Sequence, residues 1–435
     1  MNGTPKPADV YTKLQRIAEL ARQMPDQALT SLAHRIDIEW LREAYQRTRK
    51  DGAVGVDRVA AEQYAANLEA KLKSLLERVK TASYVAPPVR RVHIPKDGGT
   101  RPIGIPTFED KVLQRAYAMV LEAVYEQEFR DCSYGFRPGR SAHQALDAFW
   151  KQMMAMGGGW VLELDIQSYY DTLDHGQLRQ IIERRIRDGS VLRHIGKWLK
   201  AGVMEERRVW HPERGTPQGG VISPILSNIY LHEVLDVWFE REVQPRLKGR
   251  AFLIRYADDA ALGFSLEEDA RRVLEVLPKR FERYGLTLHP EKTRLVRFEP
   301  KRHDGDNDPG TFDLLGFTHY WGKSRKGKAI IKRKTASKRL RRAVTRISQW
   351  CRKHRHERLH TQHQGLARRM RGHYGYYGIT GNSRMLAKFW HTTERSWRYW
   401  LSRRSQRATI NWERFKHLLR VFPLPSPRIV HSIYR

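Results

Sequence analysis

The sequence predicts a mixed α+β fold with antiparallel sheet structure and a long helical section toward its C-terminal end. Apolar runs paired around short polar turns, at residues 89–105 and 251–264, are typical of β-hairpins. Much of the remaining chain has apolar residues at helical spacing, above all beyond residue 336. Because 435 residues exceed the usual size of one compact core, we expect several packed subdomains.

The first 160 residues are predicted to be mainly helical. Amphipathic spacing predicts helices near residues 4–23, 36–48, 60–80, 109–129 and 141–156. The hairpin 89–105 interrupts them, and its tip, KDGGT, carries a cation that is suited to holding phosphates.

The middle of the chain alternates strands with helices. Strands are predicted at 161–165, at 293–298 and within FDLLGFTHY, besides the hairpin 251–264. Helices are predicted near 174–187, 191–201, 223–238 and 267–284. In the third of these, Ser223 and Pro224 fit an N-cap and a first helical residue. The main boundary falls between 321 and 335, before Arg-rich helices that run to about residue 419.

Charge is concentrated beyond that boundary. The chain has a net charge of +32, and residues 321–435 supply +28 of it, with 31 Lys and Arg against three acids. This excess indicates a polyanionic partner.

Two cysteines cannot form a disulfide framework or a cysteine-rich zinc site. No run approaches the roughly 18 apolar residues of a membrane-spanning helix, and no signal peptide is recognisable.

Three acidic residues stand at the ends of predicted strands. Asp165 follows the strand VLEL, and Asp258 and Asp259 form the turn of the second hairpin. If these strands are neighbours, the carboxylates converge and can bind two Mg²⁺ ions about 3.5 to 4 Å apart, as in-line phosphoryl transfer requires. An isolated Asp-Asp pair is more often a solvated turn, so the assignment depends on the other motifs.

Those motifs together resemble the reverse transcriptases. KDGGTRPIGIP, LELDIQSYYDTLDH, GTPQGGVISPILSNIYL, RYADD, HPEKT and LLGF occur in the order and approximate spacing of that family's fingers and palm blocks. With GFRPGR, they make residues 28–435 similar to a bacterial group II intron reverse transcriptase/maturase. The resemblance implies a right-hand polymerase: fingers, a palm with an antiparallel sheet, and a helical thumb followed by a helical maturase section.

The resemblance also implies a division of the chain and a function. The parts would be an N-terminal extension (1–58), fingers (59–160, with part of 171–215), a palm (161–320), and a thumb with the maturase section, domain X (321–435). The implied enzyme is an RNA-directed DNA polymerase that extends a DNA primer on an RNA template with dNTPs. It would also bind group II intron RNA to assist splicing and retrohoming, in the bacterial cytoplasm and near the nucleoid. No C-x-x-C pair is present, so we expect no Cys-paired endonuclease domain.

Family motifs assign catalytic roles to five positions. Asp165, Asp258 and Asp259 would bind the metal ions, with the backbone carbonyl of Ile166 as a further ligand. Lys292, in HPEKT, would protonate the departing pyrophosphate. A plain structural role for Lys292 remains an equal alternative.

Other positions correspond to nucleotide-binding residues of the family. Lys96 and Arg101 flank the tip of the first hairpin, where they would contact phosphates. Tyr170 would block a ribose 2′-hydroxyl, although many relatives have Phe there and core packing is the alternative. Gln218 would touch the template–nucleotide pair, and Gly219 would permit close backbone approach.

RNA binding is assigned to RRMRGHYGYYG, the densest basic and aromatic patch. Arg368, Arg369 and Arg371 would contact phosphates, and Tyr374 would stack on an unpaired base. Two alternative functions stay open: a domesticated reverse transcriptase of phage defence or CRISPR adaptation, and an RNA-binding splicing factor without polymerase activity. The intact acidic residues argue against the second alternative.

Overall fold

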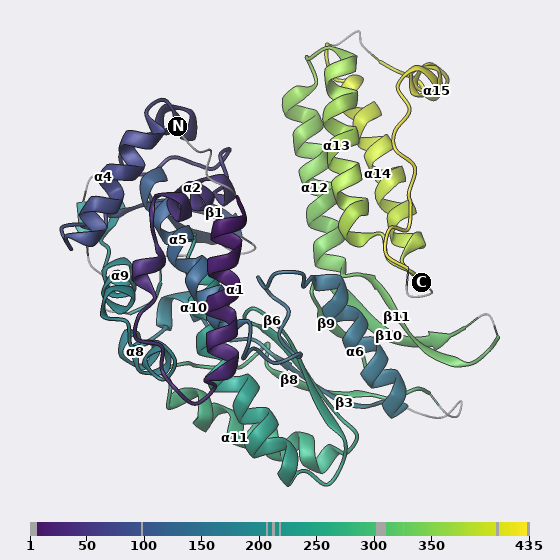
Figure 1. Ribbon diagram of the computed structural model, residues 1–435. Helices are drawn as coiled ribbons and strands as arrows, with labels where there is room; N and C mark the ends of the chain where they lie inside the picture. Colours follow the sequence, from purple (N-terminus) through teal and green to yellow (C-terminus); the bar gives the residue numbers. More distant parts are fainter. Residues whose placement is uncertain are drawn as a thin grey trace. The chain divides into compact units, whose positions relative to one another are not determined.

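The computed structural model has the mixed α+β fold that the sequence predicts (Figure 1). It describes residues 7–96, 99–205, 208–210, 214–216, 219–301, 310–324, 326–405 and 409–432. The chain divides into two compact units. The first comprises Met1–Ser141, Leu164–Ala260 and Arg271–Arg294, and the second comprises Ala142–Glu163, Ala261–Ala270 and Leu295–Arg435.

The first unit is organised around α5, Phe108–Tyr125, which is buried on nearly every side. Thr107 caps this helix by accepting a hydrogen bond from the Asp110 amide. The other helices described in this unit are α1 (Pro7–Gln23), η1 (Ala33–Arg35), α2 (Ile38–Arg47), α3 (Ala61–Ala65), α4 (Leu68–Lys80), α7 (Tyr169–Thr172), α8 (His175–Glu183), α9 (Gly189–Leu199) and α10 (Ser223–Leu231). Two π-helical segments, η2 (His232–Val237) and η3 (Phe239–Val243), and the 3₁₀ turn η4 (Gln244–Arg246) continue α10.

The predicted first hairpin is confirmed. Strands β1 (Val89–Lys96) and β2 (Gly99–Ile105) pair antiparallel, with Ile94 opposite Arg101. They belong to a sheet in the order β2-β1-β4-β5. The added strands, β4 (Val203–Glu205) and β5 (Arg208–Trp210), were not predicted, because three residues are too few to show an alternating pattern.

A second four-stranded sheet carries the acidic motifs. Its strands are β3 (Gly159–Leu164), β6 (Ala251–Tyr256), β7 (Asp259–Phe264) and β8 (Arg294–Phe298), in the order β6-β7-β3-β8. A Cβ at Gly159 would lie 2.1 Å from the Phe264 carbonyl oxygen, so β3 begins where β7 ends. These two neighbouring strands therefore run antiparallel. Helix α11 (Glu267–Glu282) follows β7.

The second unit contains the basic helices. Its three-stranded sheet, β9 (Phe312–Leu314), β10 (Phe317–Lys323) and β11 (Ala329–Thr335), has the order β11-β10-β9. Its helices are α6 (Ala142–Met156), α12 (Ser337–His354), α13 (Leu359–Tyr377), α14 (Ser383–Leu401) and α15 (Trp412–Val421). Helices α12, α13 and α14 stand side by side around a core that includes Leu366 and Trp397 (Figure 1).

Two local predictions are wrong in detail. The helix predicted for 60–80 is two helices, α3 and α4, with the break before Leu68. Ser223 is not an N-cap, since α10 begins at Ser223 and its hydroxyl instead lies 2.8 Å from the Thr216 hydroxyl. The polar sequence PKRHDGDNDPG (300–310), which predicts a loop, falls mostly on residues 302–309, outside the described part. No helix in the described part combines the length and apolarity needed to cross a membrane.

Candidate active site

The predicted catalytic carboxylates lie at one edge of the sheet β6-β7-β3-β8. Asp165 directly follows β3, while Asp258 precedes β7 and Asp259 is its first residue. Because β3 and β7 are antiparallel neighbours, Asp165 and Asp259 leave the sheet at the same edge. We call these three residues the carboxylate edge. The two strands are therefore neighbours, which is the condition that the prediction set.

A buried arginine fixes the turn that carries Asp258 and Asp259. Arg255 is 0% exposed, and its guanidinium donates to the two Asp236 carboxylate oxygens at 2.7 and 2.5 Å. It also donates to the Ala257 carbonyl at 3.0 Å. Ala257 has φ +56°, a conformation that is strained for an alanine. The hydrogen bond from Arg255 therefore holds the backbone immediately before the acidic pair.

The remaining donors of Arg255 are also used. They reach the Ser133 hydroxyl at 2.8 Å and the Asn228 side-chain oxygen at 3.0 Å, which completes a buried network. Gly135 belongs to the same loop as Ser133, and a Cβ there would lie 2.3 Å from the Ala257 nitrogen. Only glycine lets this loop approach the acidic turn so closely. The sequence offered one signal for this network, a single arginine in an otherwise apolar strand.

Lys292 lies beside Asp165. Its ammonium is 3.3 and 3.5 Å from the two carboxylate oxygens, so it acts as a counter-ion to Asp165. The backbone supports this contact, because the Asp165 carbonyl accepts a hydrogen bond from the His289 amide at 2.8 Å. Two residues further along the chain, the Gln167 amide donates a hydrogen bond to the Thr287 carbonyl at 2.8 Å. This pattern directs the intervening carbonyl, that of Ile166, away from the 287–289 segment.

The donors at this edge have the chemistry of a site for a divalent metal ion. Carboxylate and backbone carbonyl oxygens are the ligands that hard divalent cations prefer. Among the described residues, however, no three His, Cys, Asp or Glu side chains stand close enough to hold one ion. Beside this edge, the Lys292 ammonium pairs with the Asp165 carboxylate at 3.3 Å.

The two tyrosines after Asp165 have different surroundings. Tyr169 is 2% exposed and its hydroxyl donates to the Ser227 carbonyl at 3.0 Å, so it belongs to the core. Tyr170 is half-buried and packs edge-to-face on Tyr169. Burial raises the pKa of Tyr170, and the negative charge of Asp258 raises it further. Tyr170 therefore lies within the electrostatic reach of the acidic turn.

The first hairpin contributes a cation to the same region. The positive charge of Arg101 opposes the rise in the pKa of Tyr170 that burial causes. Burial also raises the pKa of Asp171, and the positive charges of Arg91 and Arg101 oppose that rise. The charge of Arg101 is thus felt at both Tyr170 and Asp171. Lys96 ends β1, but its side chain lies outside the described part.

The glycine-rich loop packs on the first hairpin. Gly219 has φ +114°, and a Cβ there would lie 2.7 Å from the Ile103 side chain and 2.8 Å from the Gly104 carbonyl oxygen. No larger residue fits without displacing β2. The predicted contact of Gln218 cannot be placed, because residues 217 and 218 lie outside the described part.

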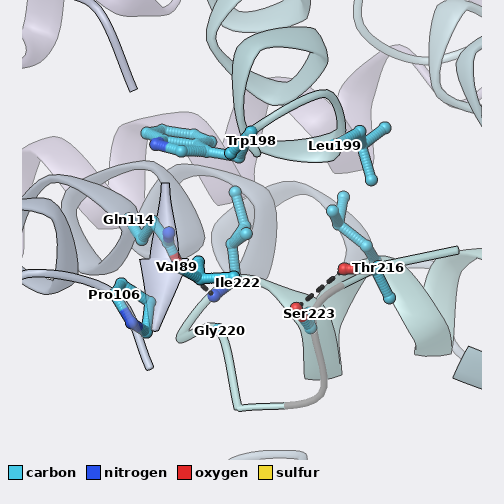
Figure 2. A pocket seen from close by; sticks show the side chains of 11 residues that line it. Val89, Pro106, Gln114, Trp198, Leu199, Thr216, Gly220, Ile222 and Ser223 are labelled. Carbon is cyan, nitrogen blue, oxygen red and sulfur yellow. Dashed lines mark hydrogen bonds between the residues drawn. The ribbon is translucent and has the colours of Figure 1, made fainter. Parts of the chain in front are cut away.

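Buried side chains support the loop from beneath. Figure 2 shows Gln114, on α5, with its side chain directed toward the backbone at Ile222. The Gln114 side-chain oxygen accepts hydrogen bonds from the amides of Val221, at 2.8 Å, and Ile222, at 3.3 Å. Its nitrogen donates to Asp110 at 2.9 Å. The residues after the glycine pair are thereby fixed to the central helix.

Asp110 is the buried anchor of this support. Its carboxylate accepts hydrogen bonds from the Trp198 indole at 2.8 Å and from the Tyr84 hydroxyl. Burial raises the pKa of Asp110 to about 6, and the hydrogen bonds oppose that rise. The sequence analysis missed this network. The available signal was an acid on the buried face of an apolar helix.

The predicted RNA-binding residues divide into two groups. Arg368, Arg369 and Arg371 are exposed on α13. Tyr374 is 1% exposed, and its hydroxyl donates to the Pro425 carbonyl at 3.2 Å. The expectation that Tyr374 stacks on RNA is therefore wrong. Its helical position turns it into the core that α13 shares with α12 and α14.

Comparisons with known proteins agree with these motifs. Residues 94–319 match the family described as "Reverse transcriptase (RNA-dependent DNA polymerase)". The group II intron-encoded protein LtrA of Lactococcus lactis is 36% identical over 300 residues, covering 66% of this chain and 49% of LtrA. Protein YkfC of Escherichia coli is 33% identical over 337 residues, covering 66% of this chain and 86% of YkfC. Nuclear intron maturase 2 of Arabidopsis thaliana is 27% identical over 177 residues, covering 32% of this chain and 24% of that protein. This chain thus spans about half the length of LtrA.

Proposed function

The chain belongs to the reverse transcriptase family, in its group II intron-encoded branch, and from this we propose that it is an RNA-directed DNA polymerase that also binds group II intron RNA. The observation that carries the polymerase half is the carboxylate edge. Acidic residues from the ends of two neighbouring strands lie there, and two-metal phosphoryl transfer would use such carboxylates. The names of LtrA and of nuclear intron maturase 2 refer to introns and not to defence systems, which favours this function over a domesticated enzyme.

We assign polymerase parts to the chain as follows. The fingers (59–160, with part of 171–215) include the hairpin β1–β2, and the palm (161–320) includes the sheet with the carboxylate edge. The thumb and maturase section (321–435) follows the palm, and an N-terminal extension (1–58) precedes the fingers. The proposed limit at residue 321 lies inside β10, so the helical part itself begins later, at α12.

In the proposed catalytic centre, Asp165, Asp258, Asp259 and the Ile166 carbonyl would hold two Mg²⁺ ions. Such ions lower the pKa of a primer 3′-hydroxyl and stabilise the charge of the leaving pyrophosphate. Arg255 keeps the acidic turn in one conformation, so that little reorganisation is needed when the substrate arrives. Lys292 is close enough to the carboxylate edge to hold a proton for the leaving group.

Other side chains would position the nucleotide and the template. Arg101 and Lys96 would hold the triphosphate, because guanidinium and ammonium groups are strong phosphate ligands. Tyr170 would lie against the sugar and exclude a 2′-hydroxyl. The loop with Gln218 and Gly219 would contact the template–nucleotide pair, supported from beneath by Gln114.

The RNA-binding half of the proposal rests on the basic section, residues 321–435. Its charge of +28 requires a polyanion, and the exposed Arg368, Arg369 and Arg371 offer phosphate contacts. We propose that this section docks intron RNA, assists its splicing and so supports retrohoming. We expect the protein to act in the bacterial cytoplasm, close to the nucleoid that holds its DNA targets.

The direct test of the polymerase half is primer extension on an RNA template with a titration of Mg²⁺. Wild-type protein should extend the primer only when a divalent cation is present. Asp165→Asn should reduce the rate at least about a hundredfold, because weaker charge stabilisation costs several kcal/mol. Asp313→Asn, at an exposed acid of β9, is the matched control and should leave the rate unchanged. Extension by Asp165→Asn at more than about a hundredth of the wild-type rate would contradict the metal assignment.

A further inference from the structure

A basic groove lies in the second unit, where β11 ends and α12 packs against α14. Its volume is about 550 Å³, within the usual range for sites that hold small ligands. The groove is lined by residues of β11, α12 and α14 alone. It is separate from the patch on α13 that contains Arg368, Arg369 and Arg371.

The lining of the groove combines two kinds of surface. Leu340, Val344 and Met385 are apolar and are buried or half-buried. Around them stand three cations, Lys334, Arg341 and Lys388, and four hydroxyl side chains. The lining residues include no acid. A ligand that fits must therefore present both negative charge and an apolar face.

The cations of the groove have no acidic counter-charge in the described part of the chain. None of the ion pairs found there involves Lys334, Arg341 or Lys388. Arg341 and Lys388 are exposed, and the Lys334 ammonium lies 5.1 Å from the centre of the Tyr320 ring. Ser337, another lining residue, is the first residue of α12, so the positive end of that helix dipole also favours an anion here.

We propose that this groove binds an unpaired segment of RNA. The three cations would hold consecutive phosphates, while a base or sugar would cover the apolar floor. Unpaired nucleotides suit this surface because their bases are free to leave a stack, whereas an A-form duplex keeps its bases inside and presents phosphates and hydroxyls. The inference rests on the proposed RNA-binding function of the basic section and gives it a defined site and ligand class.

The test compares two double variants with equal changes of charge. Arg341→Glu with Lys388→Glu reverses the groove, whereas Lys353→Glu with Arg420→Glu reverses two exposed cations on α12 and α15 that do not line it. All four side chains are exposed, so both proteins should melt cooperatively near the wild-type temperature. The probes are a single-stranded oligouridylate and a blunt RNA duplex of equal length.

We expect the groove variant to bind oligouridylate at least about tenfold more weakly than the control variant does, with a salt slope lower by roughly one for each phosphate that it no longer binds. Both variants should bind the duplex equally and should extend an annealed primer–template with unchanged KM. An equal reduction of oligouridylate affinity in the two variants would overturn the inference. A raised primer–template KM in the groove variant would also overturn it, because the groove would then hold the growing duplex.

The outcome separates this inference from the proposed function. If wild-type protein binds oligouridylate but the two variants behave alike, RNA binding stands and the groove is not its site. If wild-type protein binds neither RNA probe, the RNA-binding half of the proposed function fails, and the inference fails with it.

Discussion

Arg255 and Arg371 are both arginines of this chain, but they are held in opposite ways. Arg255, at the carboxylate edge, is fully buried and donates to four side chains or backbone groups around it. Arg371, in the basic section, is exposed on α13. The first arginine fixes the geometry of neighbouring groups, while the second presents a charge to solvent.

The same contrast holds for the two regions as wholes. In the first unit, a buried network centred on Arg255 holds the acidic turn, and another centred on Asp110 holds the glycine-rich loop. Phosphoryl transfer needs such fixed geometry, because small displacements of reacting groups are costly. In the basic section, most cations lie on helix surfaces around a separate apolar core. RNA docking needs their charge but tolerates movement of individual side chains.

The largest expected effect is at Arg255. Arg255→Met leaves the Asp236 carboxylate buried without its partner, so the free energy of unfolding should fall by about 3 to 5 kcal/mol. The double variant Arg255→Met with Asp236→Leu removes both charges and should recover much of that stability. It should still fail in primer extension, since the Ala257 carbonyl no longer has its donor. Urea denaturation and extension assays measure the two effects, and full activity in the stable double variant would contradict the positioning role.

A second prediction concerns pH and Asp110. Its pKa is raised to about 6 in the folded protein, so its contribution to stability is present at low pH and is lost as the pH rises through about 6. Because the pKa moves from its ordinary value of 3.8 to about 6, the stability lost over this pH range amounts to about 3 kcal/mol. Asp110→Asn should therefore flatten the dependence of the unfolding free energy on pH between about 4 and 7. An unchanged pH profile would show that Asp110 stays ionised throughout this range.

Gly219→Ala should damage the glycine-rich loop. The added Cβ would meet the Ile103 side chain and the Gly104 carbonyl. Alanine also adopts this positive φ only with strain, so the free energy of unfolding should fall by about 1 to 3 kcal/mol. Extension should fall because the loop that we propose to contact the template moves off β2. Gly196→Ala is the control, because no atom lies near that Cβ and the substitution should slightly stabilise α9. Equal effects of the two substitutions on extension would contradict the role of Gly219.

The smallest expected effect is a change in sugar selectivity. Tyr170→Ala should raise the ratio of kcat/KM for ribonucleotides over deoxyribonucleotides by about tenfold, because discrimination would rest on one excluded hydroxyl. Tyr170→Phe keeps the ring and should leave the ratio near that of the wild type. If Tyr170→Ala does not change the ratio, another residue must exclude the 2′-hydroxyl.

The sequence predicted those parts of the fold that depend on local patterns. Both hairpins and most helices were recognised, because apolar period and turn residues are local properties. The acidic residues were recognised through their motifs. The buried partners were not, because Asp236 and Arg255 are 19 residues apart and nothing in a linear pattern links them. Tyr374 was misassigned although its spacing from Leu366 and Met370 fits one buried helix face.

The central claim is that synthesis and RNA docking are carried by different regions of the chain. It is tested most directly by measuring primer extension and intron RNA affinity side by side in two variants. Asp258→Ala with Asp259→Ala should abolish extension and leave RNA affinity within a few-fold of wild type. Arg368→Glu with Arg371→Glu should weaken RNA binding, reduce its salt slope by roughly one for each phosphate that is no longer bound, and leave extension of a short annealed primer intact. If either variant loses both activities while it remains folded, the two regions do not act separately and the claim is contradicted.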